Sequence, residues 1–200
     1  MDALDAMRER NDRQLWLLAI VPSGPNGRLL AAVAIVALLL PVFFLSGAFG
    51  SGSWSTATFF CAILAYITPV FHLVTERTEA AFDALAPRLA MEPETLAAAR
   101  RSIRRKTVGS QLRVVAVAVI IWLLQSRLLA GSFEAMGEIF TGSALEFVMS
   151  VAPLPVWLFM YAATAALLQN ARLFRLLAAR VRVDLLDPEA LTPFGYMAAS

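Results

Sequence analysis

The sequence predicts an all-α integral membrane protein with four transmembrane helices in two hairpins, accompanied by amphipathic helices on the cytoplasmic side. Two observations support this fold class. Hydrophobic residues make up 59% of the 200 residues and charged residues only 16%, whereas soluble proteins have about 45–50% and about 25%. Between Leu29 and Thr75 there is no Asp, Glu, Lys or Arg, and this stretch is much longer than the roughly 20 apolar residues that cross a bilayer.

The N-terminal segment, residues 1–28, is expected to lie on the cytoplasmic side. Charges of both signs alternate at helical spacing over residues 2–14, which predicts a solvated helix and not a cleaved signal peptide. The apolar residues 15–21 are too few to span a bilayer, and they include Trp16, a residue type favoured at membrane interfaces. We therefore expect residues 15–21 to lie at the membrane surface or to pack against the other helices.

Residues 29–75 are expected to form the first transmembrane hairpin, with spans at about 29–49 and 55–75. A short turn rich in Gly and Ser separates the two spans. At about 1.5 Å per residue, each span is long enough to cross roughly 30 Å of hydrocarbon. Pro41 and Pro69 lie inside these spans, where each removes a backbone hydrogen bond and is expected to kink its helix.

Residues 76–113 form the longest polar segment and are expected to be a basic, helical, cytoplasmic connection. Glu92-Pro93-Glu94 is typical of a helix start, because proline suits the first turn and acidic residues suit its positive end. We expect the helix that begins there to continue without a break into the third span. Residues 114–168 are then the second transmembrane hairpin, with spans at about 114–129 and 147–168.

Residues 169–200 are expected to be a basic amphipathic helix followed by a tail, both cytoplasmic. The orientation follows from the Lys and Arg residues: four precede the first span, eight lie between the second and third, and four follow the fourth. Only Arg127 is left for the opposite side. By the positive-inside rule both chain ends are cytoplasmic. The Arg-, Ala- and Leu-rich composition is typical of GC-rich bacteria, which indicates a bacterial inner membrane.

The two halves of the chain resemble each other in organisation. Each has two spans, a short outer connection and a polar segment that contains an acid-Pro-acid-x-Leu sequence, at residues 92–96 and 187–191. This pattern could reflect a parallel repeat about an axis along the membrane normal. Coincidence is the alternative, since acid-Pro-acid is a common helix start.

His72 is the single histidine and lies near the end of the second span. An ionisable group inside a membrane is a candidate functional residue, and an imidazole could ligate a haem or a chlorophyll-type tetrapyrrole. The alternative is a neutral structural histidine near the interface. We favour the structural role and expect no cofactor.

The basic residues beside the membrane are candidates for binding anionic lipid headgroups. The set comprises Arg100, Arg101, Arg104, Arg105, Lys106, Arg172 and Arg175. Because the first five lead directly into a membrane span, the nearest phosphates are those of lipids, and each such residue adds about 1 kcal/mol of attraction. We expect no nucleic-acid binding. An acidic protein partner at this cluster is the alternative.

The sequence contains no pattern typical of an enzyme. It has no Gly-rich phosphate loop, no metal-spaced His or Cys group, and no nucleophile elbow. We therefore expect a non-enzymatic membrane module that associates with other membrane chains or with itself, either as an accessory or assembly subunit or as the membrane part of a signalling sensor. The alternatives are a small oligomeric channel or transporter subunit, and a haem- or pigment-binding subunit that uses His72.

Overall fold

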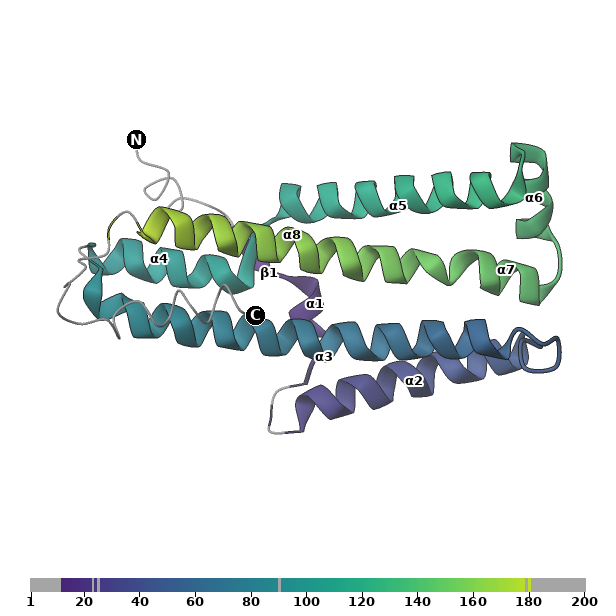
Figure 1. Ribbon diagram of the computed structural model, residues 1–200, viewed down its shortest axis with the longest axis horizontal. Helices are drawn as coiled ribbons and strands as arrows, with labels where there is room; N and C mark the ends of the chain where they lie inside the picture. Colours follow the sequence, from purple (N-terminus) through teal and green to yellow (C-terminus); the bar gives the residue numbers. More distant parts are fainter. Residues whose placement is uncertain (1–11, 23, 25, 90, 179, 181–200) are drawn as a thin grey trace.

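The computed structural model of the chain describes residues 12–22, 24, 26–89, 91–178 and 180. Helices dominate the described residues, and two short strands form a small antiparallel ribbon (Figure 1). In chain order the elements are β1 (Asp12–Gln14), α1 (Trp16–Ala19), α2 (Gly27–Leu45), α3 (Trp54–Leu85), η2 (Ala86–Arg88), α4 (Pro93–Arg104), β2 (Arg105–Thr107), α5 (Val108–Ala130), α6 (Phe133–Thr141), α7 (Ala144–Val151) and α8 (Pro153–Ala178).

Four helical segments are long and apolar enough to cross a membrane: α2, α3, α5 and the combined α7–α8 segment. They pack as two hairpins, α2 with α3 and α5 with α8, so the predicted fold class is confirmed. The 32 residues of α3 extend over about 48 Å, which exceeds the roughly 30 Å of a hydrocarbon core. The C-terminal part of α3, from Glu76 onward, is rich in charges and therefore projects beyond the apolar layer.

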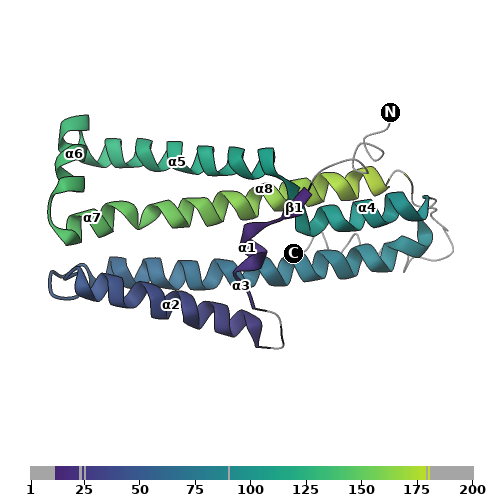
Figure 2. The ribbon, with the colours of Figure 1, turned by 180° about the vertical axis from the view of Figure 1, so that it is seen from behind.

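The four spans lie side by side in a row and do not form a closed bundle. Both views show the order α5, α8, α3, α2 across the molecule (Figures 1 and 2), and the contacts between α5 and α8, α8 and α3, and α3 and α2 agree with it. At the end opposite α4, α7 also packs against the first hairpin, where its Val148 lies beside buried Phe43 and Cys61. Two helices, α2 and α5, therefore form the edges of the row.

Two side-chain hydrogen bonds join the spans of the second hairpin in its outer half. The indole Nε1 of Trp122 on α5 donates to the carbonyl oxygen of Ser150 on α7 at 2.8 Å. The indole of Trp157 on α8 donates to the Gln125 side chain on α5 at 2.5 Å. Because a polar group in hydrocarbon must find a protein partner, these bonds fix the register of the two spans.

The short helix α1 fills the space between the two hairpins. Leu15, Leu17 and Leu18 are buried there against Phe71 of α3 and against small residues of α8. Packing against the other helices, one of the two predicted positions for residues 15–21, is observed for these three leucines.

The end of the molecule that carries α4, which we call the basic end, has a core of its own. It is formed by the projecting part of α3, by α4 and by the last turns of α8. Its buried side chains are Phe82, Leu85, Leu89, Ala99, Ile103, Leu173, Phe174 and Leu177. This core makes the basic end an ordered platform attached to the spans.

At the basic end, the observed secondary structure differs from two of the predictions made from the sequence. Residues 12–14 of the expected N-terminal helix form strand β1, which pairs with residues 105–107 in β2; the remainder, residues 2–11, lies outside the described residues. The helix expected to run unbroken into the third span ends at Arg104, and α5 starts anew at Val108. The Thr107 hydroxyl caps that new helix by accepting from the Ser110 amide at 3.3 Å, which stabilises the break.

Candidate functional site

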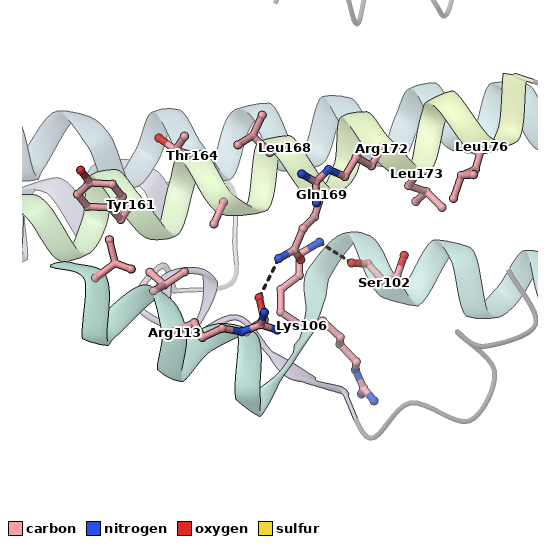
Figure 3. A pocket seen from close by; sticks show the side chains of 15 residues that line it. Ser102, Lys106, Arg113, Tyr161, Thr164, Leu168, Gln169, Arg172, Leu173 and Leu176 are labelled. Carbon is pink, nitrogen blue, oxygen red and sulfur yellow. Dashed lines mark hydrogen bonds between the residues drawn. The ribbon is translucent and has the colours of Figure 1, made fainter. Parts of the chain in front are cut away.

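A cavity of about 700 Å³ opens at the basic end between α4, β2, α5 and α8 (Figure 3). We call it the basic cleft. The α5 wall is formed by Ser110, Arg113, Val114 and Val117, whose spacing of i, i+3, i+4 and i+7 places them on one helical face. The α8 wall is formed by residues between 161 and 176 that recur at the same spacing.

Three arginines give the cleft its charge. Arg105 comes from β2, Arg113 from α5 and Arg172 from α8, and none of the described residues that line the cavity is Asp or Glu. All three side chains are exposed, and within the described part of the chain none of them pairs with a carboxylate. The Nε of Arg113 donates to the carbonyl oxygen of Gly109 at 3.2 Å, which leaves the terminal nitrogens available.

Beneath these arginines lies a network of buried polar side chains. Lys106 is only 6% exposed, and its Nζ donates to the Ser102 carbonyl oxygen at 2.7 Å and to Oδ1 of buried Asn170 at 2.9 Å. Gln169 donates to the Ser110 hydroxyl at 2.8 Å (Figure 3). These bonds join β2 to α4 and α8, and α8 to α5, so four elements hold the floor of the cleft in place.

The part of the cleft nearer the spans is mostly aliphatic. Val114 and Val117 of α5 and Leu168 of α8 line it, and we call these three residues the aliphatic wall; Tyr161 and Thr164 of α8 lie beside them. Figure 3 shows Arg113 and Arg172 extending from the two helices into the space between them. One cavity therefore presents guanidinium groups beside an aliphatic surface.

Two of the arginines predicted to bind lipid form ion pairs with carboxylates of the same chain. Arg100 makes two 2.8 Å hydrogen bonds to the Asp83 carboxylate, and Arg104 bonds to both oxygens of Glu79 at 2.6 and 2.7 Å. The hydrogen bond with Glu79 raises the pKa of the Arg104 guanidinium above its ordinary value. Both pairs join α4 to the projecting part of α3.

The other predicted residues fall into two groups. Arg105, Lys106 and Arg172 line the basic cleft, whereas Arg101 and Arg175 are exposed outside it. Arg113 and Gln169 complete the cleft and are not among the residues predicted from the sequence. The signal that could have found them is the matching helical spacing of polar residues in the first turns of α5 and the last turns of α8.

His72 lies near the basic end of α3 and is half-buried. Its Nδ1 is 3.3 Å from Oε1 of Glu76 but makes no hydrogen bond, and Glu76 pairs with Arg28 of α2 at 2.9 Å. Among the described residues there is no group of three or more His, Cys, Asp or Glu side chains that could hold a metal ion. Whether His72 has a structural role or ligates a tetrapyrrole stays a prediction.

No known protein family, curated protein or solved structure matches this chain. The fold itself defines its class, a multi-pass α-helical membrane protein with four candidate spans. Its main structural features are the row of spans, the ordered platform and the basic cleft.

Proposed function

We propose that the chain is a non-enzymatic subunit that works within a larger assembly in a bacterial inner membrane. The observation that carries this proposal is the row arrangement of the spans. In the whole of α5 only Ala118 is buried, and α2 on the other edge buries only Gly27, Ala31 and Phe43. A row presents two broad faces and two edges to its surroundings, and side chains of neighbouring chains can pack against such surfaces as well as lipid can.

The platform supports the same proposal. A chain that acted only inside the hydrocarbon layer would not need α3 and α8 to extend beyond that layer. It would also not need the separate core that these two helices form with α4. Such an ordered platform suits contact with a partner outside the membrane. Because 16 of the 17 Lys and Arg residues precede, connect or follow the spans on this side, we place the basic end in the cytoplasm.

Site-specific cross-linking tests the proposal. A photoreactive residue replaces Leu124, which is 57% exposed on α5, and the full chain is activated in its native membrane. We expect one heterologous membrane protein to be joined to this position. The matched control is Ala118 on the same helix, which is fully buried and should give no product. Cross-links to lipid alone would contradict the proposal, and cross-links only to a second copy would favour the alternative of an oligomeric channel.

A further inference from the structure

We propose that the basic cleft binds one anionic phospholipid, with its phosphate held by Arg105, Arg113 and Arg172 and one acyl chain along the aliphatic wall. This inference goes beyond the subunit function proposed above and does not depend on it. It assigns a ligand class to a defined cavity, where the sequence predicted only a general attraction of the basic residues to the membrane surface.

The positive charge of the cleft supports the binding of a phosphate group. The three arginines come from separate elements and meet at one cavity whose lining contains no carboxylate. Their situation differs from that of Arg100 and Arg104, whose guanidiniums are occupied by Asp83 and Glu79. Guanidinium groups present paired N–H donors that match the oxygens of a phosphate. The cleft therefore has the donors for a phosphate group, and among the described residues no carboxylate pairs with them.

The aliphatic wall distinguishes a lipid from a soluble phosphate. A free phosphate would contact the arginines but would leave Val114, Val117 and Leu168 without an apolar partner. An acyl chain attached to the same phosphate covers these side chains and removes their surface from water. The volume of about 700 Å³ lies within the range of about 300–1,000 Å³ that small-molecule sites have, which is sufficient for a headgroup and the first part of a chain.

The position of the cleft agrees with this ligand. It lies where α5 begins and where the charged end of α8 leaves the apolar segment, so its depth corresponds to the headgroup layer of a bilayer. The floor is built in advance of binding, because Lys106 and Gln169 are already fixed by hydrogen bonds to Ser102, Asn170 and Ser110.

Native mass spectrometry of the full chain in detergent tests the proposal. The protein is titrated with phosphatidylglycerol or with phosphatidylcholine, and bound lipids are counted. We expect one phosphatidylglycerol to bind more tightly than any further lipid, and phosphatidylcholine to bind weakly. In the double variant R113Q/R172Q the affinity of that first site should fall by at least about tenfold, the effect of losing two headgroup contacts. The matched control R101Q/R175Q removes the same charge from exposed positions outside the cleft and should bind as the wild type does.

Two further measurements separate the sources of binding. V117W fills the aliphatic wall from a partly exposed position without changing any charge, and it should weaken phosphatidylglycerol binding as well. Inorganic phosphate at millimolar concentration should not displace the lipid. The proposal is overturned if the two double variants lose affinity equally, which would indicate diffuse surface attraction. Displacement by phosphate, or full binding by V117W, would show a phosphate site without a lipid chain.

Discussion

Lys106 shows that a charged residue can have a structural role when it is buried. In the sequence it is one member of a basic run, whereas in the structure its ammonium group lies under the cleft and bonds to Ser102 and Asn170. Arg105, its direct neighbour, is exposed because successive residues of strand β2 point to opposite sides. Two adjacent cations therefore have separate positions: Lys106 is part of the buried framework, and Arg105 lies at the proposed lipid site.

Replacing Lys106 by Met tests its framework role. The variant keeps the aliphatic stem but removes the donor to Oδ1 of buried Asn170, so we expect the free energy of unfolding to fall by about 1–3 kcal/mol. Thermal unfolding of the detergent-solubilised protein measures the change. Arg105→Met is the control and should shift stability by no more than about 0.5 kcal/mol, as exposed substitutions do. Equal effects of the two substitutions would show that Lys106 is not a structural residue.

At the scale of elements, α4 is fixed to α3 by a repeated pattern of opposite charges. Glu79 and Asp83 are four residues apart on α3, and Arg100 and Arg104 are four residues apart on α4. Because the two helices run antiparallel, the first acid meets the second arginine and the second acid meets the first. This complementarity is present in the sequence and could have predicted the pairing, although the basic run suggested lipid contact instead.

A double-mutant cycle on Glu79 and Arg104, using E79Q and R104Q, measures the strength of this connection. We expect a coupling energy of about 1 kcal/mol at low salt, which decreases as salt screens the pair. The corresponding cycle with D83N and R100Q should give a smaller coupling, because both of its side chains are more exposed, 48% and 56% against 18% and 40%. A larger coupling for the outer pair, or none for Glu79 and Arg104, would contradict this description of the α3–α4 contact.

The sequence predicted the long elements well and the short ones poorly. Apolar runs bounded by charges identify spans because hydrocarbon excludes charges, and all four were found. The β1–β2 ribbon has only three residues on each strand, so neither strand shows a periodic pattern in the sequence. Its pairing joins residues about ninety positions apart, and such a contact depends on how the hairpins assemble.

At the scale of the whole molecule, the row of spans is the feature that the sequence could not predict. Every face of a span is apolar, so the pattern does not tell a face covered by lipid from one covered by another helix. The order α5, α8, α3, α2 depends on contacts between particular side chains, among them the Trp157–Gln125 bond, the packing of α1 between the hairpins and the packing of α7 on the first hairpin. The cleft between α5 and α8 follows from the same arrangement, which is why its complete lining was not foreseen.

Topology tests the central claim most directly, because the proposed subunit role places the basic end in the cytoplasm. In a Cys61→Ala background, single cysteines replace Ser51, in the turn between α2 and α3, and Ala97 on α4; both positions are exposed. Intact cells are treated with a membrane-impermeant thiol reagent. We predict labelling of position 51 in intact cells and of position 97 only after permeabilisation. Labelling of position 97 in intact cells, with position 51 protected, would contradict the account.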